Sequence, residues 1–151
     1  MIKNILYTLV AVFVGCGLVL TSSCSSKEDQ LKAAVEKIDE SCPTSVGEGI
    51  SFQQVRLVEN DVNMTFTIQE DVISTALTTE SVKEWKEPFV TMFSALVYDN
   101  ADVASLFRLI DDTQSTMTVT ISTLPTGATY PLAFSRDDIA RILAVDKIPA
   151  K

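Results

Sequence analysis

Hydrophobic and polar positions repeat with two different periods along this chain, and the two periods predict its elements. Apolar residues at helical spacing predict four amphipathic helices, over residues 29–42, 82–97, 101–111 and 136–144. Alternating apolar and polar residues predict two pairs of strands, over residues 50–58 with 62–68 and 116–121 with 130–134. Hairpins combined with helices predict an α+β fold, in which two β-hairpins form a small antiparallel sheet with helices packed on one face.

The ends of these elements carry local signals of their own. Three helices have expected capping residues, namely Ser81 with Glu84, either Asn100 or Asp99, and Ser135 with Asp138. Pro88 lies inside the second helical pattern, so that helix either kinks or starts afresh there. Pro131 lacks a backbone donor, which predicts an edge strand. Imperfect alternation around Gln53 predicts a bulge, and residues 44–49 are expected to form a loop.

The first 23 residues have the layout of a secretory signal peptide. Lys3 is followed by an apolar run of 16 residues, Ile5 to Leu20, and then by small polar residues. A membrane-spanning helix needs about 20 apolar residues and a signal core about 7–15, so the length alone is borderline. Two glycines and the small residues argue against an uncleaved anchor helix and favour cleavage. A secreted soluble protein is a further alternative.

Cys24 follows this segment, and the chain then becomes abruptly polar over residues 25–30. This ending resembles a bacterial lipoprotein signal of the Bacteroidota type, followed by a small domain. The resemblance implies that Cys24 is lipidated and anchors the protein in the cell envelope, with the outer membrane as the expected site. The charges of residues 25–29 resemble export tags of surface-exposed lipoproteins. The expected organisation is a signal peptide (1–23), a short tether (24–30), a single α+β domain (31–145) and a loose tail (146–151).

Charge and composition exclude several classes of function. Removal of residues 1–23, which contain one lysine and no acidic residue, changes the net charge from −8 to −9. Such a surface repels phosphate backbones and argues against nucleic acid binding. The chain contains no histidine, which excludes His-activated nucleophiles and His-based zinc sites. We therefore expect no catalytic residues, no metal site and no cofactor.

Acidic pairs and a single downstream cysteine remain to be explained. Glu70-Asp71, Asp111-Asp112 and Asp137-Asp138 lack the spacing of a calcium loop, and we assign them to solvated element ends. Cys42 shares helical spacing with Leu31, Val35 and Ile38, which favours a place in the core. A reactive thiol and an intermolecular disulfide are its alternatives.

An aromatic surface is the best candidate for binding. The helix after Val82 is rich in aromatic residues, which mostly indicates a core helix, but Trp85 has charged neighbours on both sides. We expect any binding surface to include Trp85, Tyr98 and Tyr130. The favoured hypothesis is a non-enzymatic, lipid-anchored envelope domain that binds a protein partner or a small ligand. The alternatives are a structural or inhibitory accessory of an envelope complex and a small carboxylate-dependent hydrolase.

Overall fold

The computed structural model describes residues 25–73 and 75–144. The predicted signal peptide, the predicted lipidation site Cys24 and the predicted tail 146–151 lie outside the described residues. Helix α2 (Lys27–Asp39) begins inside the predicted tether, because the Ser26 side chain caps it by accepting a hydrogen bond from the Asp29 N–H (3.2 Å). Only Ser25 and Ser26 precede this helix among the described residues. Within the described ranges, no helix has the length and hydrophobicity to cross a membrane.

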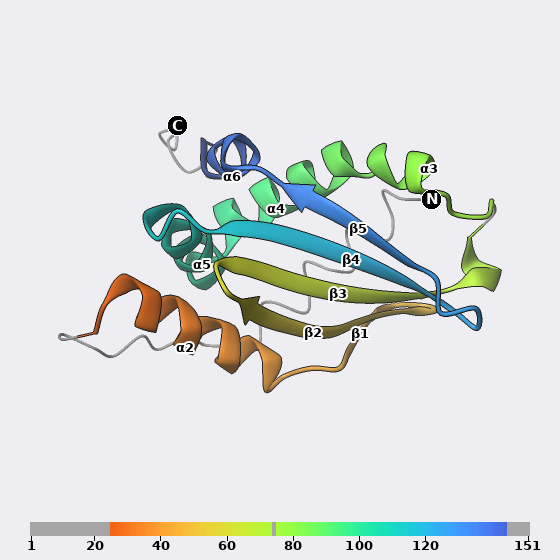
Figure 1. The fold of residues 1–151 in the computed structure, drawn as a ribbon, viewed down its shortest axis with the longest axis horizontal. Coiled ribbons are helices and arrows are strands. Elements are labelled where there is room, and N and C mark those ends of the chain that lie inside the picture. The colour runs from red at the N-terminus through yellow and green to blue at the C-terminus, as the bar shows by residue number, and fades with distance from the viewer. Residues whose placement is uncertain (1–24, 74, 145–151) are drawn as a thin grey trace.

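Five strands form one sheet that is backed by helices (Figure 1). The strands are β1 (Thr44–Gly47), β2 (Ile50–Val58), β3 (Asp61–Gln69), β4 (Thr116–Leu124) and β5 (Thr129–Phe134). The remaining elements are the 3-10 turn η1 (Glu70–Val72) and the helices α3 (Thr79–Lys83), α4 (Lys86–Asp99), α5 (Ala101–Asp112) and α6 (Arg136–Leu143). The strand order is β1-β2-β3-β4-β5. The predicted α+β class is confirmed.

The sheet is mixed, so the prediction of two hairpins in a purely antiparallel sheet was wrong in detail. Strands β3 and β4 run parallel, while the other neighbouring pairs are antiparallel. The chain leaves β3, crosses over through α3, α4 and α5, and returns to the end of the sheet at which β3 began, which makes the pair parallel. Residues 44–47, expected in a loop, form the short edge strand β1 with Val46 buried.

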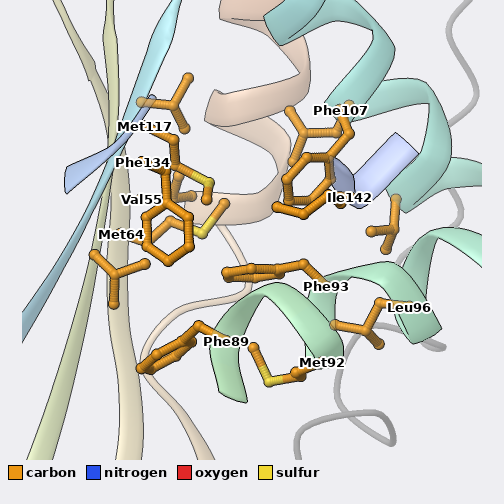
Figure 2. Packing of buried hydrophobic residues seen from close by; sticks show 14 of the residues in the cluster. Val55, Met64, Phe89, Met92, Phe93, Leu96, Phe107, Met117, Phe134 and Ile142 are labelled. Carbon is orange, nitrogen blue, oxygen red and sulfur yellow. The ribbon is translucent and has the colours of Figure 1, made fainter. Parts of the chain in front are cut away.

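The alternating pattern divides the sheet into a buried and an open face. On β3 the residues at even positions, Val62 to Ile68, are buried, and their polar neighbours are half-buried. Figure 2 shows the helices on one side of the sheet, with aromatic side chains of both layers interleaved. Phe93 lies at the centre, with ring centroids 5.3 Å from Phe107 and 6.0 Å from Phe134. Helices on one face were therefore predicted correctly.

Most predictions about element ends are confirmed. Asn100 caps α5, the β2 bulge lies between Phe52 and Gln54, and Pro131 lies on the edge strand β5. The helical region 82–97 breaks into α3 and α4 just before Pro88, which is then tolerated in the first turn of α4.

Two local predictions were wrong. The capping box of α3 pairs Thr78 with Ser81, so Ser81 is its third helical residue and does not form a box with Glu84. Helix α2 ends at Asp39, so Cys42 lies beyond it. Cys42 is half-buried against the core, with Sγ 3.6 Å from the Ile38 carbonyl oxygen.

Candidate binding cleft

A cleft lies at the end of the sheet where β3 and β4 finish. The turn after β4 closes through two backbone hydrogen bonds, from the Gly127 N–H to the Thr123 carbonyl (2.8 Å) and from the Thr123 N–H to the Ala128 carbonyl (2.9 Å). Gly127 has a φ of 71°, which a residue without a side chain adopts at little cost. The segment after η1 passes beside this turn. The two segments together therefore enclose a solvent-accessible space.

The cleft has a volume of about 500 Å³ and a mixed lining. Its apolar side is formed by Ile73, Ala76, Leu77, Ala128 and the Tyr130 ring, and its polar side by Glu70, Thr75, Thr123 and Thr126. Apolar walls with a few polar groups are typical of ligand sites, and this volume falls in their usual range.

Glu70 supplies the charge of the cleft. Its Oε1 atom accepts hydrogen bonds from the Thr126 hydroxyl and from the Thr126 N–H (3.4 Å). The Thr126 hydroxyl hydrogen bond lowers the pKa of Glu70 below its ordinary value, with a smaller contribution from Thr123. The carboxylate is therefore ionised at neutral pH. Because an ionised carboxylate has about four lone-pair sites, it can still accept from a ligand.

The three predicted binding residues do not all line the cleft. Tyr130 lines the cleft, and its hydroxyl donates to the Leu77 carbonyl (2.9 Å). Trp85 is half-buried against the core at the N-cap of α4, whereas Tyr98 is 61% exposed near the opposite end of that helix. Thirteen residues of helix span about 20 Å, so Trp85 and Tyr98 do not share a surface.

Glu70 and Thr126 were missed as site residues. Glu70 was assigned with its neighbour to a solvated element end, but its carboxylate bonds across to the β4–β5 turn. The two residues are 56 positions apart, and no local spacing in the sequence reports their contact. Only a correct pairing of β3 with β4 would have revealed it.

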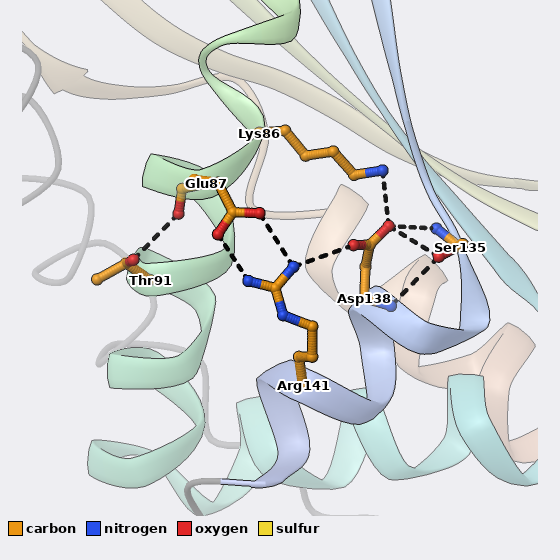
Figure 3. A network of polar contacts seen from close by, with 6 residues as sticks. All are labelled: Lys86, Glu87, Thr91, Ser135, Asp138 and Arg141. Carbon is orange, nitrogen blue, oxygen red and sulfur yellow. Dashed lines mark hydrogen bonds and ion pairs between the residues drawn. The ribbon is translucent and has the colours of Figure 1, made fainter.

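A second polar cluster joins α4 to α6 (Figure 3). Arg141 binds Glu87 with two hydrogen bonds of 3.0 and 2.6 Å, and Asp138 lies 2.7 Å from Lys86 and 3.5 Å from Arg141. Burial would raise the pKa of Asp138, but hydrogen bonds from Lys86 and Ser135 outweigh it and hold that pKa below its ordinary value. The hydrogen bond from Arg141 likewise lowers the pKa of Glu87. Every carboxylate here has a cationic partner, so the cluster holds two helices together.

The described ranges contain no group of three or more His, Cys, Asp or Glu residues placed to hold a metal ion. Within the same ranges, no buried side-chain nitrogen or oxygen lacks a hydrogen-bond partner. The cleft is a candidate binding site on account of its volume and its mixed apolar and polar lining.

Comparison with known proteins places the fold. No protein-family model and no curated protein matches the sequence. Among solved structures, the chain is similar to the pilotin EpsS of the Vibrio vulnificus type 2 secretion system, with a TM-score of 0.50, 15% identity, and coverage of 75% of this chain and 94% of the pilotin. It is also similar to a Pseudomonas aeruginosa protein described as secreted, with a TM-score of 0.46, 16% identity, and coverage of 78% and 99%. The pilotin and this chain share a fold.

Proposed function

We propose that this protein is a lipid-anchored, non-enzymatic domain of the bacterial cell envelope that binds a protein partner at its cleft. The observation that carries the proposal is the placement of Cys24 directly before the folded part of the chain. Helix α2 begins at Lys27, so two serines separate Cys24 from the first helical residue. A lipid on Cys24 would hold the domain against the membrane and fix which end faces it.

The cleft lies at the end of the sheet that faces away from such an anchor. The start of α2 lies beside the end of α5, since Lys27 Nζ is 3.3 Å from Asp112 Oδ2, and β4 starts four residues later at Thr116. The seven residue steps from Thr116 to Thr123 then span about 23 Å, and Thr123 and Thr126 line the cleft. Figure 1 shows α2 beginning at the end of the sheet opposite the β4–β5 turn. The cleft is thus presented outward, where it can reach a partner.

The fold likeness to a pilotin supports a partner that belongs to an envelope assembly. The pilotin is named as part of a type 2 secretion system. A structural or inhibitory accessory of an envelope complex is accordingly the form of partner binding that we favour over capture of a small ligand. Outer-membrane placement and exposure on the cell surface are further parts of the proposal, and protease shaving of intact cells tests the exposure.

The chemistry of the carboxylates disfavours a hydrolase. Glycoside hydrolysis needs one carboxylic acid with a raised pKa. The pKa values of Glu70, Glu87 and Asp138 are all lowered, and Arg141 contacts the last two. These groups stay ionised and are poor proton donors at neutral pH.

Two experiments test the proposal. Cells labelled with an alkyne fatty acid should yield labelled wild type and labelled Cys42→Ala, but unlabelled Cys24→Ala. Equal labelling of Cys24→Ala would contradict the lipid anchor. Hydrolysis by the purified protein that disappears in Glu70→Gln would contradict the non-enzymatic assignment.

A further inference from the structure

The segments that build the cleft carry no positive charge. Residues 57–82 and 109–135 contain no lysine or arginine. They contribute Glu70 to the cleft itself and Asp71 to an adjoining depression of about 360 Å³. The β1–β2 turn adds Glu48 at the same end, since the Gln69 N–H donates to the Gly49 carbonyl (2.8 Å). A ligand that enters here meets negative charge with no basic side chain of these segments to offset it.

Apolar surface accompanies this charge. Ile73 and Leu77 line the cleft beside the Tyr130 ring. The neighbouring depression is lined by Leu124, which is 46% exposed and is one of few large apolar side chains on the described surface. Exposed apolar groups that adjoin a concave site are typical of binding surfaces.

We propose that the cleft binds a peptide segment of the partner in which a lysine or arginine stands next to an apolar side chain. The cation would lie at the Glu70 carboxylate, and the apolar side chain would pack against Ile73 and Leu77. The inference rests on the proposed function, because it names the chemistry of that partner. Charge complementarity selects this ligand over an acidic peptide or a phosphate-bearing molecule, both of which the carboxylates repel.

A short probe peptide tests the inference on the full chain in non-ionic detergent micelles. The probe is a fluorescein-labelled hexapeptide with one Lys-Leu pair between glycine and serine residues, and empty micelles serve as the blank. The matched probes carry Glu-Leu or Lys-Ser instead. Fluorescence anisotropy at low salt should detect binding of the Lys-Leu peptide at least fivefold tighter than either matched probe. Equal binding of the Glu-Leu peptide would overturn the inference.

Matched variants separate the cleft from the general attraction of an acidic protein. Glu70→Gln removes the charge but keeps an acceptor for Thr126, and Ala76→Lys places a cation at an exposed position on the rim. Both should weaken binding at least fivefold. Glu36→Gln makes the same charge change on α2, where the side chain is 65% exposed, and should alter binding less than twofold. The cleft is not the site if Glu36→Gln weakens binding as much as the cleft variants do. It is also not the site if both cleft variants keep the wild-type binding and melting temperature.

Crosslinking in cells distinguishes failure of this inference from failure of the proposed function. A photo-crosslinking amino acid at Ala76 should give a discrete protein adduct, while the same residue at Thr118 on the open sheet face should not. An adduct from Thr118 alone would overturn the inference and the cleft as the contact surface, but it would leave a partner-binding envelope domain as the function. No protein adduct from either position would contradict the proposed function itself.

Discussion

Removal of the Asp138 carboxylate should destabilise the protein far more than removal of the adjacent Asp137 carboxylate. Asp138 Oδ2 accepts hydrogen bonds from the Ser135 N–H (2.8 Å) and hydroxyl (2.9 Å) and lies 2.7 Å from Lys86 Nζ. Its side chain is only 9% exposed. Asp137 is exposed in the same first turn of α6 and takes no part in the capping box.

The expected magnitude follows from these contacts. Loss of a helix cap costs about 1 kcal/mol. Loss of a hydrogen bond between charged groups costs about 1.5 kcal/mol or more when the pair is shielded from water, and Lys86 is 32% exposed. Asp138→Ala should therefore lower the free energy of unfolding by about 2–3 kcal/mol. Asp137→Ala loses only an interaction with the helix dipole, about 0.3–1 kcal/mol.

Urea denaturation measures the difference directly. Circular dichroism and Trp85 fluorescence should give coincident transitions, as a two-state interpretation requires. With a slope of about 1–3 kcal/mol per molar urea, the midpoint of Asp138→Ala should fall by about 1 M relative to wild type. If the two alanine variants unfold at the same urea concentration, the cluster in Figure 3 does not hold α6 on α4 and the reasoning is wrong.

Three further predictions follow from the core, the titrating groups and the turns. Phe93→Ala should lower the free energy of unfolding, measured by urea denaturation, by about 3–5 kcal/mol, because it leaves a cavity at the centre of the aromatic cluster. Tyr98→Ala on the same helix should change it by less than about 0.5 kcal/mol. Because the pKa of Asp138 is lowered in the folded state, the stabilisation from its carboxylate is present above about pH 4 and is lost as the pH falls through that folded-state pKa. In acid titrations followed by circular dichroism, wild type should therefore lose stability more steeply than Asp138→Asn below about pH 4. Gly49→Ala should lower the melting temperature more than Gly127→Ala. Both glycines have positive φ, but only at Gly49 would a Cβ lie 2.8 Å from a methyl group of Val72. Equal decreases in melting temperature would contradict the clash.

The sequence predicted those features that depend on neighbouring residues. Alternation over six to nine residues placed β2, β3 and β4, and Asn100 and Ser135 marked helix starts that the structure shows. Strand β1 was missed because four residues are too few to show an alternating pattern. The start of α3 was misplaced because Thr78 and Ser81 can both cap a helix, and the sequence does not rank them.

Features that depend on the pairing of distant strands were not predicted. Each hairpin carries its own alternating pattern, but nothing in either pattern says whether the two hairpins meet in parallel or antiparallel. The long crossover between Gln69 and Thr116 favours a parallel pair, since it holds three helices that can return the chain to the starting end. Because the pairing of β3 with β4 was not predicted, Tyr130 was the one predicted site residue found at the cleft, and its polar neighbours Glu70 and Thr126 were missed.

The parallel β3–β4 pairing, which the predicted antiparallel sheet lacked, is also what builds the cleft. In the β3–β4 register Gln69 lies opposite Leu124, so both strands finish at the same end of the sheet. The residues that follow them, Glu70 and Thr126, therefore come into contact. If β3 and β4 were antiparallel, the β4–β5 turn would lie at the opposite end of the sheet, beside the start of α2 and the proposed anchor. The crossover through α5 therefore performs two tasks. It brings the start of β4 to the end of the sheet where α2 begins, and it places the cleft a full strand length away from that end. A lipid on Cys24, as proposed, would hold that end at the membrane and leave the cleft facing away from it.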